Sequence, residues 1–341
     1  MAKPKPLISV IIVNWNGRRY LEDCLGSLSK STYRKTEIIF VDNNSSDDSV
    51  SFVKRNFPYI KIIVNKKNLG FAEGHEIAYR RAKGEAILLL STDTIIEKDT
   101  IEYLWQALYS TKNIGAVQPK LLMYPRTNLI DSIGSFFLMS GVLYHYGREK
   151  DHRKPIYNVP MEIYSAKGAC ILFKKYVLDI TGLFDKDYFA YFEETDLCHR
   201  IWLAGYKIIY VPKAVVYHKG GGASGQMVSS YIQFHSFKNR ICTYVKNLSF
   251  NYLIIVLPMT ILIYACSSIV FFIQGKFSLA WVPQKAIIWN VAHIKETLNK
   301  RSIVQTRIRR IKDDSFLPGL IRPVRLSYYY LFIKGFSNYQ D

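Results

Sequence analysis

The chain has 341 residues, of which 49% are hydrophobic and 14% aromatic, and it carries a formal net charge of +19. This composition excludes a disordered chain, and the length exceeds that of a single small module. A charge this large predicts an anionic partner, such as nucleic acid, anionic lipid or a phosphorylated substrate.

Strand-like and helix-like patterns alternate over the first 110 residues. The β-branched run 7–13 predicts a strand that is buried on both faces, 37–41 is predicted as a second buried strand, and 60–64 and 86–90 as two further strands. The segments 18–30, 47–56, 72–82 and 100–110 lie between or after them and are predicted helices. This order predicts an α/β fold with a mostly parallel central sheet, in which ligands bind beyond the carboxyl ends of the strands.

The alternation becomes looser after about residue 115. We expect strands at 168–173 and 207–211, a helix at 193–204, and a strand-like segment at 214–218 that leads into Gly220, Gly221 and Gly222. A boundary near residue 230 separates this first domain, residues 1–230, from a tail of different composition, residues 231–341.

The tail is both basic and hydrophobic. It contains 15 Lys and Arg against 4 Asp and Glu, a net +11, and it includes the uncharged segment 252–273. As a helix, this segment would reach roughly 33 Å, which is enough to cross a bilayer core. We therefore predict a membrane-associated helical region and no nucleic-acid partner, because no nucleic-acid reader motif is present.

The topology of the tail is left open by the sequence. A single crossing would put Arg301 and the later basic residues on the opposite side of the membrane from the catalytic domain, against the positive-inside rule. The weaker apolar stretch 277–294 would instead allow a re-entrant hairpin or two interfacial helices. The five cysteines are odd in number and have no CxxC pair, which indicates reduced, buried thiols and a catalytic domain that faces the cytoplasm.

Two aspartates follow predicted strands. Asp42 could accept hydrogen bonds from a nucleobase or a ribose, or it could belong to a polar turn. Asp93 could bind Mg²⁺ or Mn²⁺ together with a diphosphate, because hard oxygen ligands suit these ions. The alternative for Asp93 is a helix N-cap, with residues 94–97 beginning the next helix.

Carboxylates and a histidine follow later in the chain. Glu193, Glu194 and Asp196 lie within four residues, where one could act as a general base while the others bind acceptor hydroxyls. The alternative is an acidic first turn that faces the helix dipole. His218 ends a strand-like run and could be a Mn²⁺ ligand or a structural residue.

In order, these segments resemble the family-2 glycosyltransferases with the GT-A fold, particularly the rhamnosyltransferase-like branch. The resemblance covers residues 7 to about 225. The segments that carry it are 11–17 (IIVNWNG), 41–47 (VDNNSSD), 68–72 (NLGFA), 88–94 (LLLSTDT), 168–169 (GA), 182–185 (GLFD), 191–198 (YFEETDLC), 204–206 (AGY) and 217–218 (YH). The sequence departs from the family pattern at Ser91, at Glu194, which replaces the usual Asp, and at Glu73, His75 and Glu76.

The resemblance implies a GT-A nucleotide-sugar-binding domain and a role for each matching residue. Glu194 corresponds to the catalytic base, and Asp93 and His218 to the site of a Mn or Mg divalent cation. The nucleotide-binding residues would be Asn14, Asn16, Asp42, Asn44, Asn68 and Gly70. The acceptor side would be formed by Gly168, Ala169, Glu193 and Asp196.

The predicted function is that of an inverting, metal-dependent glycosyltransferase in cell-surface polysaccharide synthesis. It would move a sugar, with rhamnose as one candidate, from a nucleotide-diphosphate sugar to a saccharide or polyprenyl-linked acceptor at a membrane. The alternatives are a non-catalytic nucleotide- or carbohydrate-binding membrane protein and a nucleotidyltransferase. A nucleotidyltransferase should carry a Gly-rich basic phosphate loop after the first strand, and residues 14–19 (NWNGRR) do not form one.

Overall fold

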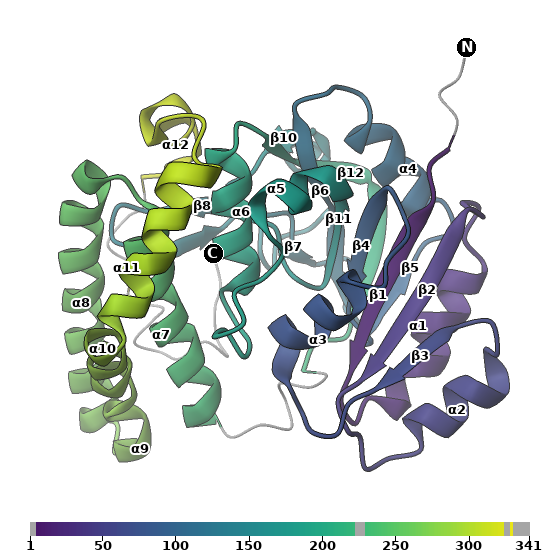
Figure 1. Cartoon of the computed structure of the whole chain (residues 1–341), viewed down its shortest axis with the longest axis horizontal. Coiled ribbons are helices and arrows are strands. Elements are labelled where there is room, and N and C mark those ends of the chain that lie inside the picture. Colours follow the sequence, from purple (N-terminus) through teal and green to yellow (C-terminus); the bar gives the residue numbers. More distant parts are fainter. Residues whose placement is uncertain (1–4, 222–228, 324–327, 330–341) are drawn as a thin grey trace.

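A computed structural model of the protein describes residues 5–221, 229–323, 328 and 329, and Gly222 lies outside these residues. The chain forms a central sheet flanked by helices, with a separate layer of helices on one side (Figure 1). The sheet begins with the predicted alternation. Its first elements are β1 (Ile8–Asn14), α1 (Arg18–Ser29), β2 (Thr36–Asp42), α2 (Ser49–Asn56), β3 (Lys61–Val64), α3 (Gly70–Tyr79) and β4 (Ala86–Leu90).

The second half of the sheet is mixed. The strand order is β10-β12-β6-β11-β4-β1-β2-β3, and β11 runs antiparallel to both β4 and β6. Six of these eight strands share one direction, which confirms the mostly parallel sheet. The elements of this half are β5 (Thr94–Ile96), α4 (Thr100–Leu108), β6 (Ile114–Met123), β7 (Ile130–Ser132), β8 (Ser135–Phe137), β9 (Leu143–His145), η1 (Pro155–Asn158), β10 (Met161–Glu162), β11 (Cys170–Lys174), α5 (Lys175–Thr181), α6 (Glu193–Leu203) and β12 (Lys207–His218).

Two predictions for this half are corrected by the structure. The segments 207–211 and 214–218 are one continuous strand, β12, which changes register against β6 between Val211 and Val215. Residues 94–96 form β5, which pairs with the end of β12, so they do not begin a helix. The pattern of β5 was ambiguous because three residues are too few to show a strand period.

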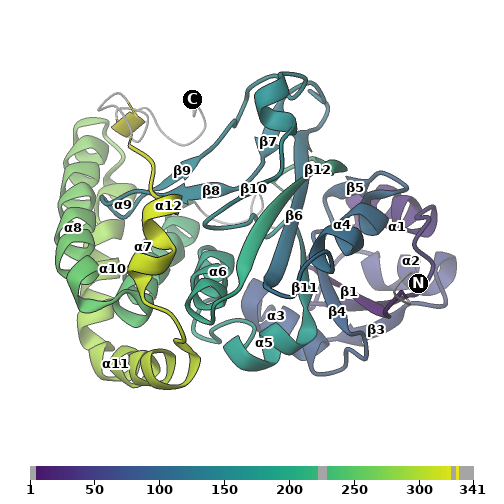
Figure 2. The same ribbon diagram turned by 90° about the horizontal axis from the view of Figure 1, so that it is seen from above.

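Buried side chains fill both faces of the sheet. In β1, Val10 and Ile12 belong to a core under α1 and α4, whereas Ile11 belongs to a core under α3, α5 and α6. Successive strand residues point to opposite faces, so a strand covered on both sides must be apolar throughout. The view in Figure 2 shows the two sets of helices on either side of the sheet.

The tail forms the separate helical layer. Its first helix, α7, lies between α6 and the outer helices (Figures 1 and 2). The helices are α7 (Ser229–Asn247), α8 (Phe250–Ile273), α9 (Phe277–Ala280), α10 (Val282–Ala292) and α11 (Ile294–Ile303), followed by η3 (Val304–Ile308), η4 (Asp313–Ser315) and α12 (Leu317–Leu320). We refer to residues 229–320 as the helical layer.

The chain returns to the catalytic domain after α8. Helix α10 packs against both α7 and α8, and the Arg310 backbone N–H donates a hydrogen bond to the carbonyl of Leu203 in α6 over 2.7 Å. In this structure Arg310 therefore lies beside α6, on the same side of the helical layer as the first domain, and the topology of the tail in a membrane stays a prediction. The return supports the alternative in which the apolar helices form a hairpin.

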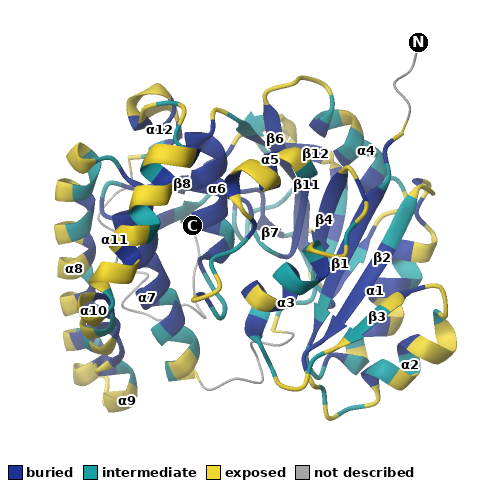
Figure 3. Cartoon of the chain, in the orientation of Figure 1, coloured by how far each residue is buried: buried dark blue, intermediate teal, exposed yellow. Residues whose placement is uncertain are grey.

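Helix α8 buries polar residues and exposes apolar ones. It is the one helix in the described part of the chain that is long and apolar enough to cross a membrane by length and composition. Thr260, Tyr264 and Ser268 point inward, whereas Phe272 is 62% and Ile273 78% exposed. Figure 3 shows α8 mostly exposed and α7 mostly buried. The cysteines are free thiols, and four are buried as predicted, but Cys266 lies exposed on α8.

Candidate active site

The carboxyl ends of β1 and β2 meet in register. Asn14 pairs with Asp42 across the two strands, and its side-chain amide donates to Asp42 Oδ1 over 2.9 Å. Asp42 also accepts hydrogen bonds from the backbone N–H and the hydroxyl of Ser45, over 2.8 and 2.6 Å. The carboxylate of Asp42 therefore braces the turn after β2, and its contact with a nucleotide stays a prediction.

Asn16 in the turn after β1 and Asn44 in the turn after β2 both have positive φ, at 50° and 61°. Asn tolerates this left-handed conformation better than most residues. Asn16 Oδ1 accepts a hydrogen bond from the Ser46 N–H over 2.8 Å, which ties the ends of β1 and β2 together. Neither Asn16 nor Asn44 lines the cavity described below.

The beginning of α3 closes against a distant loop. Gly70 has a φ of 76°, and a Cβ atom there would lie 2.3 Å from the carbonyl oxygen of Phe189. Asn68 Oδ1 accepts the Gly70 N–H over 2.9 Å, and the Phe71 N–H donates to the Phe189 carbonyl over 2.7 Å. Only glycine fits this close approach. Gly70 thus holds the 185–192 loop against the end of the parallel strands.

Asp93 and His218 come together where β4 and β12 end. Because His218 is paired in register with Thr94, its Nε2 atom lies 3.5 Å from Asp93 Oδ2. On the other side of the ring, His218 Nδ1 lies 2.8 Å from Asp131 Oδ2. Asp131 in turn pairs with the ammonium group of Lys167 over 2.6 Å. Despite burial, Lys167 and His218 hold the pKa of Asp131 well below its usual range.

This arrangement fits a divalent cation that is held partly by substrate. The described residues contain no group of three or more His, Cys, Asp and Glu side chains able to hold an ion. Asp93 and His218 supply one carboxylate oxygen and one imidazole nitrogen, and Asp131 fixes the ring so that Nε2 faces Asp93. A carboxylate that hydrogen-bonds the other ring nitrogen in this way orients a metal-binding histidine. Diphosphate oxygens and water would complete the coordination of Mg²⁺ or Mn²⁺.

The first turn of α6 places the carboxylates of buried Glu193 and half-buried Glu194 at the opposite wall. The Oε2 atoms of Glu193 and Glu194 have no hydrogen-bond partner, and neither side chain forms an ion pair with a described residue. Burial and the charge of Glu194 raise the pKa of Glu193 well above its ordinary value. Burial also raises the pKa of Glu194, although backbone hydrogen bonds and Lys167 oppose the shift. Such a raised pKa suits a general base.

Asp196 lies on the other face of α6 and does not reach this wall. It is fully buried, and it pairs with Lys246 over 3.0 Å and with Arg200 over 2.9 Å. Asn247 donates a further hydrogen bond to it over 2.8 Å. Although burial opposes it, Lys246 and Arg200 lower the pKa of Asp196. The structure thus separates Asp196 from the other residues predicted for the acceptor side.

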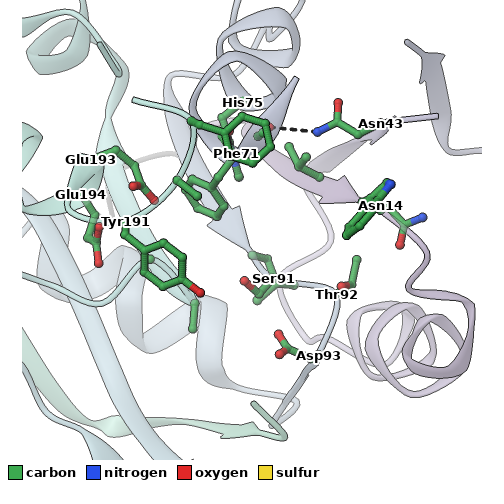
Figure 4. Close-up of a pocket in the computed structure, with 18 of the residues that line it drawn as sticks. Asn14, Asn43, Phe71, His75, Ser91, Thr92, Asp93, Tyr191, Glu193 and Glu194 are labelled. Atoms are coloured by element: carbon green, nitrogen blue, oxygen red, sulfur yellow. Dashed lines mark hydrogen bonds between the residues drawn. The ribbon is translucent and has the colours of Figure 1, made fainter. Parts of the chain in front are cut away.

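A single cavity of about 260 Å³ joins most of the predicted residues. Figure 4 shows Glu193 and Glu194 on one side, Ser91 and Asp93 on the other, and Tyr191 between them. A Cβ atom on Gly168 would lie 3.9 Å from Glu194 Cδ, so the absence of a side chain keeps that wall open. The predicted residues that line the cavity are Asn14, Asn68, Gly70, Asp93, Gly168, Ala169, Glu193, Glu194 and His218.

Other lining residues were not predicted from the sequence. His75 packs against Phe71 with ring centroids 4.0 Å apart and the rings tilted by 43°, and burial lowers the pKa of His75 to about 4, so its ring is neutral. Lys167 is adjacent to the predicted residue Gly168, and Tyr191 lies two residues before the predicted residue Glu193. That proximity was the available signal. Asp131 had none, because it lies where the periodicity is loose.

Comparisons with known proteins agree with this geometry. The model of the family "Glycosyltransferase like family 2" matches residues 4–233. The chain is 24% identical over 256 residues to the N-acetylglucosaminyl-diphospho-decaprenol L-rhamnosyltransferase of Mycobacterium tuberculosis, covering 67% of this chain and 81% of that protein. It is 23% identical over 240 residues to a low-salt glycan biosynthesis hexosyltransferase of Haloferax volcanii, covering 68% and 74%.

A solved structure shares the fold. The structure of GalNAc-T7 with UDP, GalNAc and Mn²⁺ superposes with a TM-score of 0.60 at 17% identity, covering 85% of this chain and 58% of that one. This likeness confirms the predicted GT-A fold.

The family match and the fold together identify a glycosyltransferase of the GT-A class. The family match spans most of the chain, and the chain belongs to glycosyltransferase family 2. This assignment identifies the chain as an enzyme that transfers sugars. It therefore excludes both alternatives, the nucleotidyltransferase and the non-catalytic binding protein.

Proposed function

We propose that the protein is an inverting glycosyltransferase that moves a sugar from a nucleotide-diphosphate sugar to a lipid-linked saccharide at the cytoplasmic face of a membrane. One observation carries the proposal. The Asp93–His218 pair and the Glu193–Glu194 pair bound the same cavity from opposite sides. Such a cavity can hold a diphosphate at one wall and a sugar hydroxyl at the other.

The chain's residues act on the two ends of the displacement. Asp93 and His218 hold the diphosphate end, and a divalent cation bound there would neutralise the negative charge that develops on the leaving group. Glu194 accepts the proton of the acceptor hydroxyl as its oxygen attacks the anomeric carbon. Because base and leaving group lie at opposite walls, the attack comes from the face opposite the diphosphate, and a single displacement inverts the anomeric centre.

The acceptor class follows from the relatives and from the helical layer. The Mycobacterium tuberculosis relative is named for a polyprenyl-diphosphate-linked substrate. In this chain the apolar face of α8 supports contact with lipid, because its outward residues are more apolar than its inward ones. Arg310 returns to the catalytic domain, where its backbone N–H donates to the carbonyl of Leu203, and this return of a basic segment supports a cytoplasmic orientation. Anchoring at the membrane would raise the local concentration of such an acceptor.

The proposal is tested with the full-length protein in detergent micelles. Nucleotide-diphosphate sugars, beginning with a rhamnosyl donor, are screened by thermal shift with and without Mn²⁺. A ligand at 100 times its Kd should stabilise the fold by about 2.7 kcal/mol. The proposal predicts Mn²⁺-dependent stabilisation by at least one donor and transfer with inverted configuration. It is contradicted if a donor transfers with retention, or if none binds.

A further inference from the structure

The backbone that leads into α6 has an unusual conformation. Tyr191 and Phe192 have φ values of 69° and 71°, although neither is glycine. Large side chains rarely adopt this left-handed region, and two in succession are less common still. Phe192 occupies the N-cap position of α6, where no side chain makes a capping hydrogen bond. The orientation of Glu193 and Glu194 therefore depends on whatever holds these two residues.

Asn239, on α7, holds them from the helical layer. Its side chain is fully buried, and its Nδ2 group donates to the carbonyl oxygens of Ala190 and Tyr191 over 3.0 and 2.6 Å. One amide group thus fixes two consecutive peptide planes directly before the catalytic turn. The ring of Phe192 is held by the same helix, 5.9 Å from the ring of Tyr244.

The contacts of Asn239 are confined to this loop. Its Oδ1 atom is buried without a hydrogen-bond partner. Its backbone carbonyl accepts a hydrogen bond from the hydroxyl of Tyr188, over 3.1 Å, in the same loop. Both ends of Asn239 therefore act on residues 188–191.

We propose that Asn239 is a positioning residue for the reaction, because it holds Tyr191 and Phe192 in the left-handed conformation that aims Glu194 into the cavity. The inference rests on the proposed function of Glu194. Asn239 does not touch the cavity, so it acts only through the loop. Since α7 packs between α6 and the outer helices, the helical layer sets the geometry of the catalytic turn as well as contacting lipid.

The effect should fall on turnover and spare donor binding. Glu194 lies across the cavity from the Asp93–His218 pair, so a displaced base leaves the diphosphate end intact. A misplacement of about 1 Å at a reacting group can cost about 100-fold in rate. We expect Asn239→Leu to lower kcat by about 10- to 100-fold, with the donor Kd unchanged.

Asn290 offers a matched control. It is an equally buried asparagine of the helical layer, at 6% exposure, and it also donates from Nδ2 to two carbonyls, those of Lys238 and Ala286. Its Oδ1 atom likewise has no partner. Since neither carbonyl belongs to the 185–192 loop, Asn290→Leu should leave kcat within about twofold of wild type if helix packing alone is disturbed.

The decisive experiment is a double-mutant cycle with Glu194→Gln, with kcat and donor Kd measured for each variant. The inference predicts that Asn239→Leu lowers kcat in the wild-type background and changes it less than twofold in the Glu194→Gln background, since no base remains to be aimed. Asn239→Ser, which is too short to reach both carbonyls, replaces the leucine variant if that variant does not fold. Equal losses in both backgrounds, or no loss in the wild-type background, would overturn the inference. If the wild-type chain transfers no sugar, the proposed function fails, and the inference fails with it.

Discussion

The catalytic sheet buries mostly apolar side chains, whereas the helical layer buries charged and polar side chains together with apolar ones. In the sheet, β4 is apolar throughout and β1 is apolar except for Ser9 and its last residue, Asn14, and polar groups gather at the strand ends that face the cavity. In the helical layer, α7 buries Lys238, Asn239 and Lys246, while α8 exposes Phe272 and Ile273. The sheet thus has the pattern of a domain that folds in water, with apolar side chains inside. The outer helices present apolar side chains outward, which suits an apolar medium, and the polar contacts lie at the interface between the two regions.

Helix α6 lies at that interface and shows the consequence for charge. Glu193 and Glu194 face the cavity, form no ion pair with a described residue and have a raised pKa. Asp196 lies in the same turn of α6 but faces α7. Its pKa is lowered because Lys246 and Arg200 surround it. Glu193 and Asp196 are both buried, so the supply of cations decides the protonation state. Carboxylates left without cations are the ones suited to proton transfer.

The largest expected change in stability comes from removing the cation of the interface. Lys246, with 3% of its side chain exposed, pairs with Asp185 and Asp196, and Lys246→Met would leave both carboxylates short of a buried cation. Breaking a buried pair on one side costs about 3–5 kcal/mol, which urea unfolding in micelles would measure. The control is Lys300→Met, whose side chain is 25% exposed and should cost less. Equal losses in the two variants would contradict the account.

Neutralising Glu193, a carboxylate without a cation partner, and Asp196, an ion-paired carboxylate, should change the stability of the fold in opposite directions. The pKa of Glu193 is raised in the folded state, so folding disfavours its ionised form, and this cost is largest at neutral pH, where the carboxyl group of the unfolded chain is ionised. Glu193→Gln should therefore raise the melting temperature at pH 7, and this gain should disappear as the pH falls through the ordinary carboxyl pKa of about 4.3.

Asp196 gives the matched comparison. Its lowered pKa means that its ion pairs stabilise the fold above an unfolded pKa of about 3.9 and are lost as the pH falls through the folded value. Asp196→Asn should therefore lower the melting temperature at pH 7. If Glu193→Gln also lowers the melting temperature at pH 7, the ionised Glu193 carboxylate is stabilised by its surroundings, and the proposed cause of its raised pKa is wrong.

The smallest change in folding stability is expected on the outer surface of the layer. Ile273 is 78% exposed, and Ile273→Ser should change the free energy of unfolding by no more than about 0.5 kcal/mol. Loss of a membrane-buried side chain of this size should weaken binding to anionic lipid vesicles by about tenfold or more. The control is Ile180→Ser, at 41% exposure on α5 and outside the helical layer. If both variants co-sediment with vesicles as well as wild type does, α8 is not the lipid contact.

The sequence predicted the parts of this molecule that depend on local pattern. The β-branched runs gave the parallel strands, and the residues after them, such as Asp93 and Asn14, lie at the cavity because parallel strands end at one edge. The ordered motifs brought in Glu194 and His218. Long-range partners carried no such signal. Asp131 orients His218 from a region without periodicity, and Asn239 acts on a loop about fifty residues earlier in the chain.

Two further differences have the same physical origin. The left-handed conformation of Tyr191 and Phe192 could not be predicted, because aromatic residues do not favour it and tertiary contacts impose it. Asp196 was grouped with Glu193 because the two are close in sequence. Residues three apart on a helix share part of a face. Asp196 nevertheless faces α7, where it pairs with Lys246, and it also pairs with Arg200 of its own helix.

The central claim is that the Asp93–His218 pair binds the donor while Glu194 accepts the proton, at opposite walls of one cavity. The most direct test measures donor Kd by calorimetry, with Mn²⁺ present, and kcat on the same preparations of wild type and Glu194→Gln. The account predicts an unchanged Kd and a loss in kcat on the order of 10²–10⁴-fold, the range for removing a general base. A kcat within a few fold of wild type, or a loss of donor binding equal to the loss of rate, would contradict it.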